Sequence, residues 1–357
     1  MRLGLNLGYW SGAAGSTSAA GAVSELELAV EAERLGYAAA WVAEAYGSDA
    51  ATVLGYLAAR TSKIDLGSAV MQIPARTPAT TAMTAATLEI LTGGRLRLGL
   101  GVSGPQVSEG WHGVRFDAPL GRTREYVEIV RKALTREKLR YEGKHFTLPL
   151  PDGPGKALHL MVHPPREHVP IYLAAIGPRN LRLTGEVADG WLPVFFSPEH
   201  AEEHLSHLRA GAESAGRSLD DLDIAPNVPV VIGPDWRDCA DHVRGYAALY
   251  VGGMGSREKN FYNALACRMG YEREAAQVQR HYLERNYEAA MQAVPLEFID
   301  ATALLGPVDR VAERLQAFAQ VGVGTLTVMP LAARSASDDA VETLRVMAEA
   351  FDRAGVS

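Results

Sequence analysis

The amino-acid sequence predicts an α/β fold, a (β/α)8 TIM barrel with helical and loop insertions. A pattern of amphipathic segment, glycine and short apolar run occurs three times, around Gly36, Gly190 and Gly322. The apolar runs are continuous, as is typical of parallel strands that are covered on both faces. About eight such strands alternate with helices, which favours a barrel, with a doubly wound open sheet as the alternative.

The remaining elements follow in order along the chain. Strands are expected, besides the runs after the three glycines, at residues 2–8, 64–73, 95–101, 169–175 and 224–232. A helix is expected to begin at Ser24, where Ser-Glu-Leu-Glu has the form of a capping box, and another covers residues 122–134. Gly36, Gly190 and Gly322 are expected to end helices in the left-handed conformation, which costs glycine least.

The chain is longer than a plain barrel needs. It has 357 residues, whereas a barrel of this class needs about 250. The extra residues are expected in a Pro/Gly/His-rich excursion at about 140–168 and in a helical insert at about 245–300. Because no low-complexity linker separates two parts, residues 1–357 are expected to form a single barrel domain.

Composition excludes several classes of partner. The net charge is −7 and the basic residues form no dense cluster, so we expect neither nucleic acid nor a membrane as partner. The two cysteines form no C-x-x-C pair, and the N-terminus has no basic-then-apolar leader. A cytoplasmic protein that acts on a small-molecule substrate is the expectation.

Residues 99–104, Gly-Leu-Gly-Val-Ser-Gly, fit the dinucleotide fingerprint G-x-G-x-x-G. That fingerprint needs a helix at its third glycine and an acidic residue at the end of the next strand. Here Pro105 follows, and the region about 20 residues on is expected to be helix. We interpret the stretch as a barrel strand that ends in a small-residue loop open to a flat ligand. Glycines that serve packing and turning alone remain the alternative.

Polar residues follow several strands, at the end of a barrel where active sites lie. Asn6 follows the first strand, Glu44 the second, and Ser103, Gln106 and His112 follow the strand at 95–101. The turn Gly177-Pro178-Arg179-Asn180 leads into a helix whose first amides favour a phosphate.

No metal site is expected. His200, His204 and His207 share a helical face, but their glutamate-rich segment is expected to face solvent. The sequence also lacks G-x-S-x-G, which disfavours acyl transfer.

Taken together, the chain resembles the luciferase-like superfamily, in particular its coenzyme F420-dependent oxidoreductase branch and an actinobacterial subgroup of mostly unassigned substrate. The matching segments are LGLNLGYW, VAEAYGSDA, LGSAVMQIPARTP, LTGGRLRLGLGVSGPQVSEGWHG, RTREYVEIVRKAL, AIGPRNLRL, DGWLPVFFSP and LYVGGMG, and more loosely residues 306–328.

The resemblance implies a site for the deazaflavin coenzyme F420. It implies a non-prolyl cis peptide at Ala69-Val70, in a bulge under the ring, and a phosphate site at residues 177–180. The expected cofactor-binding residues are Asn6, Ser68, Ala69, Val70, Gly101, Val102, Ser103, Gly104, Ala175, Gly177, Pro178, Arg179 and Asn180.

The sequence departs from characterised members of the branch. The Asp-His pair that sugar-phosphate dehydrogenases carry after strand 2 is Glu44-Ala45 here, and their glutamate after strand 4 is replaced by Gly104-Pro105. The pterin reductases carry a glutamate where this chain has Asn6. Neither substrate is therefore transferred to this chain.

The expected reaction is hydride transfer between coenzyme F420 and a small organic substrate with an activated C=C, C=N or C=O bond. Glu44 is the first choice for acid/base catalysis, on the hypothesis that burial against the ring raises its pKa. Ser103, Gln106 and His112 are the second choices.

Further expectations concern alternative functions, two arginines and the oligomeric state. An FMN-dependent luciferase-like monooxygenase is the alternative enzyme, and a non-catalytic cofactor-binding protein is the alternative from another class. Arg76 and Arg122 would serve an anionic group or pair with helix carboxylates. A homodimer is expected to form through residues 52–62 and 80–90, which carry small and apolar side chains. Packing within the monomer would explain these side chains equally well.

Overall fold

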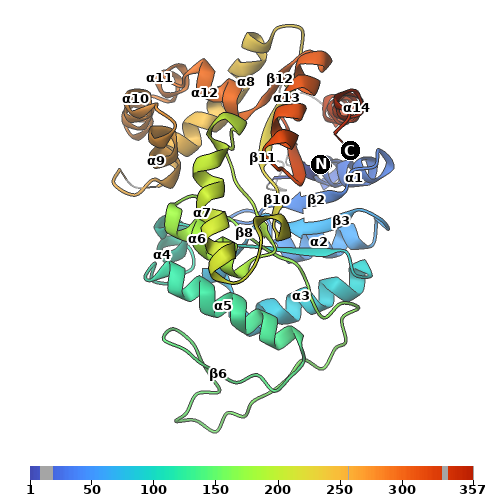
Figure 1. The fold of residues 1–357 in the computed structure, drawn as a ribbon, viewed down its shortest axis with the longest axis vertical. Helices are drawn as coiled ribbons and strands as arrows, with labels where there is room; N and C mark the ends of the chain where they lie inside the picture. Colours follow the sequence, from blue (N-terminus) through green and yellow to red (C-terminus); the bar gives the residue numbers. More distant parts are fainter. Residues whose placement is uncertain (9–18, 256, 332–336, 357) are drawn as a thin grey trace.

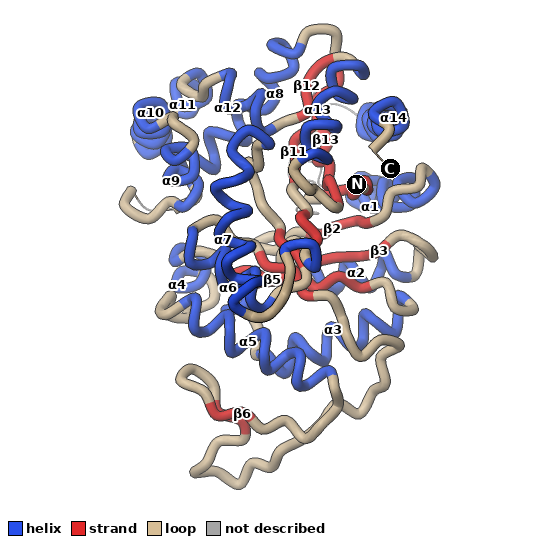
Figure 2. Tube along the Cα trace, in the orientation of Figure 1, coloured by secondary structure: helices blue, strands red, loops and turns tan. Residues whose placement is uncertain are grey.

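The computed structural model describes residues 1–8, 19–255, 257–331 and 337–356. Its main sheet is wound from strands that alternate with helices (Figures 1 and 2), and every strand pairing in it is parallel. Its strands are β1 (Arg2–Asn6), β2 (Ala39–Val42), β3 (Asp65–Ser68), β4 (Met71–Gln72), β5 (Leu96–Gly101), β8 (Ile171–Leu173), β9 (Gly190–Trp191), β10 (Asp223–Ile224), β11 (Asn227–Ile232), β12 (Leu304–Gly306) and β13 (Thr325–Pro330).

The sheet closes on itself through residues 223–227. On one side, the amides of Asp223 and Ala225 donate to the carbonyls of Asp189 and Trp191 at 3.0 and 2.9 Å. On the other side, the amide of Gly324, beside β13, donates to the carbonyl of Ile224 at 3.0 Å. The segment therefore joins the two ends of the strand order β9-β8-β5-β3-β2-β1-β13. The predicted barrel is confirmed, and the open-sheet alternative is wrong.

Helices surround the barrel (Figure 2). They are α1 (Ala19–Arg34), α2 (Ala50–Ala58), α3 (Pro78–Thr92), α4 (Pro105–Gly110), α5 (Pro119–Leu134), α6 (Pro178–Val187), α7 (Ala201–Ser214), α8 (Trp236–Ala248), α13 (Val308–Gln320) and α14 (Ser337–Ala354), with 3-10 turns at Ile73–Ala75, Pro198–His200 and Leu219–Asp221. Helix α1 already includes Ser24, so the capping-box prediction was wrong about where this helix starts.

The three glycines around which the sequence pattern repeats differ in their structural role. Gly36 and Gly322 have φ of 84° and 87°, as the helix-ending prediction requires. Gly190 does not, because it lies in strand β9. A Cβ there would come within 2.2 Å of the Tyr172 ring, so the position needs glycine for close packing inside the barrel.

The amino-terminal end of the barrel interior is filled by a charged network. The Arg97 guanidinium on β5 donates to Asp65 at 2.9 Å and to Asp223 at 3.0 Å. It also lies 5.9 Å from the ring centres of both Trp41 and Tyr172. Because these partners come from different strands, the network ties them together and closes the floor of the barrel.

Both predicted insertions are present. The first contains the antiparallel pair β6 (Tyr141–Glu142) and β7 (Thr147–Leu148) in a long loop beneath α5 (Figure 1). The second begins in α8 and continues through a π-helical turn (Leu249–Gly253), α9 (Phe261–Arg268), α10 (Glu272–Leu283), α11 (Tyr287–Gln292) and α12 (Leu296–Thr302). It packs around an apolar cluster of its own that includes Val278, Phe298 and Ile299.

No helix in the described part of the chain is long and apolar enough to cross a membrane. Cys239 and Cys267 are both free thiols.

Candidate active site

The predicted cofactor-binding residues gather at the carboxyl end of the barrel. Asn6 ends β1, Ser68 ends β3 and Gly101 ends β5, while Ala175 and Gly177 follow β8. Because parallel strands present these ends on the same side, one barrel mouth collects residues that are far apart in sequence. Residues 9 and 10, the end of the first matching segment, lie outside the described residues.

A bulge interrupts the strand expected at 64–73 and separates β3 from β4. The peptide bond between Ala69 and Val70 is cis, as the resemblance implies. Gly101 on β5 lies directly against this bulge, since a Cβ there would come within 2.5 Å of the Val70 side chain. Glycine at this position therefore lets Val70 rest on the end of β5.

Ser68 belongs to the barrel wall. Its fully buried hydroxyl donates to the Gly99 carbonyl at 2.7 Å and accepts from the Gly99 amide at 3.0 Å. A Cβ on Gly99 would come within 1.8 Å of the Ser68 carbonyl. The first glycine of the G-x-G-x-x-G stretch thus serves strand packing, and the Ser68 side chain fastens β3 to β5.

The segment after β5 carries three of the four predicted catalytic residues. Ser103 has φ of 60°, and Gly104 is the N-cap of the short helix α4. Gln106 is exposed on this helix. The amide of His112 donates to the Val107 carbonyl at 3.1 Å, which fixes the backbone of His112 at the end of α4.

Glu44 lies in a tight ion-pair network at the mouth. Its side chain is only 7% exposed and both of its oxygens bind the guanidinium of Arg76, Oε2 at 2.8 Å. The amide of Ala50 also donates to Oε2 at 3.0 Å. Arg76 contacts Asp49 as well, at 2.5 Å. The burial expected for Glu44 is present, and the charged group beside its oxygens is the Arg76 guanidinium.

Three buried polar atoms in segments that belong to or follow neighbouring strands have no hydrogen-bond partner among the described residues. They are Ser48 Oγ after β2, Gln72 Oε1 on β4 and His112 Nε2 after β5. These strands are neighbours in the sheet, in the order β5-β3-β2 with β4 beside β5. Because buried polar atoms in native proteins are nearly always paired with protein groups, water or a ligand, these three atoms are candidates for contact with a polar ligand.

The N-terminus of α6 is open, as a phosphate site requires. Gly177 is its N-cap, and a Cβ there would have no atom within 4 Å. Arg179 is exposed beside it. The guanidinium of Arg268, on α9 of the second insertion, donates to the Ile176 carbonyl at 3.2 Å and so holds the loop that precedes α6.

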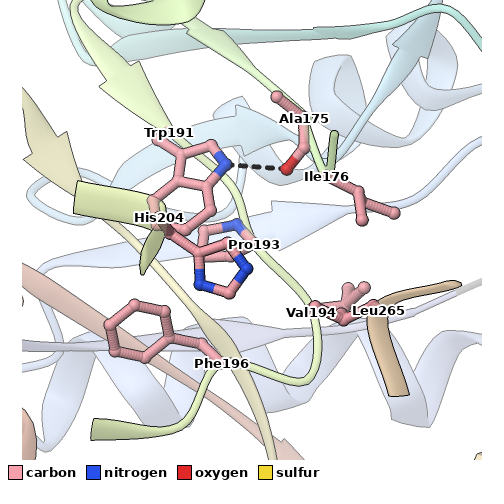
Figure 3. A pocket seen from close by; sticks show the side chains of 8 residues that line it. All are labelled: Ala175, Ile176, Trp191, Pro193, Val194, Phe196, His204 and Leu265. Atoms are coloured by element: carbon pink, nitrogen blue, oxygen red, sulfur yellow. Dashed lines mark hydrogen bonds between the residues drawn. The ribbon is translucent and has the colours of Figure 1, made fainter. Parts of the chain in front are cut away.

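Ala175 is nearly fully buried and lines a small cavity together with Trp191 and His204 (Figure 3). Its carbonyl accepts a hydrogen bond of 2.9 Å from Trp191 Nε1. The cavity beside it has a volume of only about 10 Å³, room for one water molecule, and so cannot hold a cofactor.

His204 lines the same cavity and corrects a prediction. The segment was expected to face solvent, yet His204 is 5% exposed and its ring centre lies 5.7 Å from that of Trp191. Burial lowers the pKa of His204 to about 4. No group of side chains that could hold a metal ion occurs among the described residues.

Sequence reasoning missed a cluster of arginines beside the phosphate site. Arg124 on α5 and Arg182 on α6 line one cavity together with Arg179. The two are 58 positions apart, so no local motif could have joined them. Of the two arginines considered from sequence, Arg76 pairs with Glu44, and Arg122 pairs with Asp117 at 3.0 Å.

Comparison with known proteins agrees with this architecture. The family described as luciferase-like monooxygenase matches residues 1–325. A Mycobacterium tuberculosis protein, provisionally named coenzyme F420-dependent oxidoreductase Rv3520c, is 40% identical over 345 residues, which cover 95% of this chain and 97% of that protein. The 5,10-methylenetetrahydromethanopterin reductase of Archaeoglobus fulgidus is 28% identical over 304 residues, 84% of this chain and 87% of its own.

The fold has a solved counterpart. The coenzyme F420-dependent tetrahydromethanopterin reductase of Methanopyrus kandleri aligns with a TM-score of 0.81 at 24% identity, over 99% of this chain and 98% of that one. The resemblance inferred from the sequence is therefore confirmed, and the chain belongs to the luciferase-like monooxygenase family.

Proposed function

We propose that this protein is a coenzyme F420-dependent oxidoreductase that transfers hydride between the deazaflavin and a small organic substrate with an activated C=C, C=N or C=O bond. The observation that carries the proposal is the set of buried polar atoms on Ser48, Gln72 and His112, in segments of neighbouring strands, which have no hydrogen-bond partner among the described residues. A ring with polar edges, seated between them, would supply the hydrogen bonds that these atoms lack.

The residues present fit such a cofactor. The partly exposed Ala69-Val70 bulge and residues 102–104 offer small side chains to a flat ring. The open N-terminus of α6 offers backbone amides to its phosphate, next to Arg179. When bound, the deazaflavin supplies hydride chemistry at its C5 carbon.

This chain's own part is to position the reactants and to move a proton. His112 is the proposed proton donor, because its Nε2 is buried and has no partner in the described part of the chain. Glu44 is assigned to orient Arg76 at the mouth, since Arg76 occupies both of its oxygens. Ser103 and Gln106, in the segment after β5, are proposed to contact substrate.

A His112→Gln variant tests the assignment of the proton donor. We expect single-turnover oxidation of the reduced cofactor to slow about 100-fold, the usual contribution of a general acid. The affinity for oxidised cofactor should stay within about twofold, because the glutamine amide can still form the hydrogen bond to the ring but is no acid. His163→Gln, which replaces an exposed histidine of the first insertion, is the matched control. An unchanged rate in His112→Gln would remove His112 from the proposal.

The second candidate is an FMN-dependent monooxygenase, which the description of the matched family favours. Titration of the purified protein with F420 and with FMN, followed by the fluorescence of each, separates the two. We expect saturable binding of F420 and turnover of the reduced form on a panel of electrophiles. Tight binding of FMN and none of F420 would reverse the assignment, and F420 binding without any turnover would indicate a cofactor-binding protein.

A further inference from the structure

An open cleft with excess positive charge lies between the first turns of α5 and the outer face of α6. It has a volume of about 190 Å³. Leu120 and Leu183 contribute its apolar surface, and Arg124, Arg179, Arg182 and Glu186 its charged groups. Three arginines against one glutamate leave two net positive charges, on a chain whose overall charge is −7.

The three arginines differ in what they bind. Arg124 forms an ion pair with Glu186 across the cleft. Arg179 and Arg182 are exposed, and neither makes a side-chain hydrogen bond or ion pair with any described residue. Unpaired guanidinium groups that share one concave surface are suited to carboxylates or phosphates, which they bind through two parallel hydrogen bonds.

The cleft continues from the proposed phosphate site. Gly177 caps α6 and Arg179 belongs to its first turn. Arg182 and Glu186 follow at spacings of three and four residues, so they lie on the same helical face. A ligand whose phosphate binds at the start of α6 would therefore have its next groups along this face, over about two helical turns or about 11 Å.

We propose that the cleft binds the carboxylates of the glutamyl tail of coenzyme F420, an inference that rests on the proposed function. This tail is attached beyond the phosphate, so it would leave the start of α6 in the direction of Arg182 and Arg124. FMN ends at its phosphate and would make no use of these two arginines. The cleft thus distinguishes the two cofactors by their charge beyond the phosphate.

The experiment measures the dissociation constant of F420 forms with no, two and about five glutamates, by fluorescence titration at low and high salt. For the natural protein we expect affinity to rise with tail length and to fall with salt. In Arg182→Gln and Arg124→Gln the longest form should bind about three- to tenfold more weakly. This is the loss of affinity expected when one exposed arginine–carboxylate contact is removed. The form without glutamate should bind as before.

Two further variants sharpen the test. Glu186→Gln removes the opposing carboxylate and frees Arg124, so it should tighten binding of the longest form about two- to threefold. Arg273→Gln removes an exposed arginine on α10, outside the cleft, and should change nothing. Equal melting temperatures establish that the variants are folded.

The outcomes separate the cleft from the proposed function. Affinity that does not depend on tail length in the natural protein, or an equal loss for every form in Arg182→Gln, would overturn the tail site and leave the cofactor assignment in place. Failure of every form to bind the natural protein would overturn the proposed function and the tail site with it.

Discussion

At the scale of the residue, Glu44 shows how a neighbour far along the chain decides the chemistry of a carboxylate. The sequence identifies an acidic group after the second strand, but not that Arg76, 32 positions on, binds both of its oxygens. An ion pair of this kind is built from two loops, and no local pattern predicts it. The residue was predictable and its electrostatic surroundings were not.

Replacing Glu44 by Gln tests its part in the site. We expect the free energy of unfolding to fall by about 2–3 kcal/mol, because a buried hydrogen bond to a charged group is lost. The single-turnover rate with bound cofactor should fall less than about threefold if Glu44 only orients Arg76. Chemical denaturation and stopped-flow oxidation measure the two quantities. A rate loss of about 100-fold at unchanged cofactor affinity would make Glu44 the acid after all.

His204 gives the stability a pH dependence. Its pKa in the folded state is about 4, below the ordinary value of 6.5, so between these values the unfolded chain binds more protons than the native one. Stability is therefore complete above pH 6.5 and decreases as the pH falls towards 4, by about 3 kcal/mol in all. Glu203, Arg268, His200 and His207 are the charged or titratable groups that act on the ring.

Urea denaturation between pH 7 and pH 4.5 checks this dependence. His204→Leu should flatten the curve, whereas His242→Gln, an exposed histidine on α8 that is not among these groups, should leave its slope unchanged. Glu199, whose pKa is lowered to about 2 chiefly by its hydrogen bond to Arg314, loses its contribution only below its ordinary value of 4.5, outside this range. A curve in His204→Leu as steep as in the natural protein would contradict the account.

At the scale of the element, the end of β5 packs closely against the Ala69-Val70 bulge. Gly101→Ala would place a Cβ 2.5 Å from Val70, so the bulge beside the proposed ring site must shift. We expect a loss of stability of about 1–3 kcal/mol, as for other overpacked positions, with at least tenfold weaker cofactor binding. In the control Gly110→Ala, at the end of α4, a Cβ would have no atom within 4 Å, so alanine should be tolerated. Equal affinity in the two variants, measured by fluorescence titration, would refute this function of Gly101.

Elements were largely predictable because their signals are local. Continuous apolar runs predicted β1, β5 and β11, and the apolar stripe at residues 122–134 predicted α5. The errors arose where tertiary packing decided the outcome. Gly190 ends no helix, and it is glycine because a Cβ there would collide with the Tyr172 ring. His204 is buried beside Trp191 and Phe196, although the sequence of its helix is rich in polar residues.

At the scale of the whole molecule, the expected homodimer has a candidate surface. Helices α2 and α3 pack side by side and expose Tyr56, Met83, Ile90 and Leu91, with Met83 59% exposed. We propose that a second copy covers them, since exposed apolar clusters commonly mark interfaces. Met83→Glu should then yield monomers in size-exclusion chromatography with light scattering. Met161→Glu, in the first insertion and 87% exposed, is the control. A monomeric natural protein, or a dimer that survives Met83→Glu, would rule out this surface.

The central claim is that the barrel mouth seats a deazaflavin ring and the start of α6 its phosphate. A crystal structure with oxidised F420 tests this most directly. We predict the ring against Ala69-Val70 and residues 101–104, its polar edge near Gln72 and His112, and its phosphate at Gly177–Asn180. A ring bound elsewhere, or a mouth that stays free of cofactor in crystals soaked at saturating F420, would contradict the account.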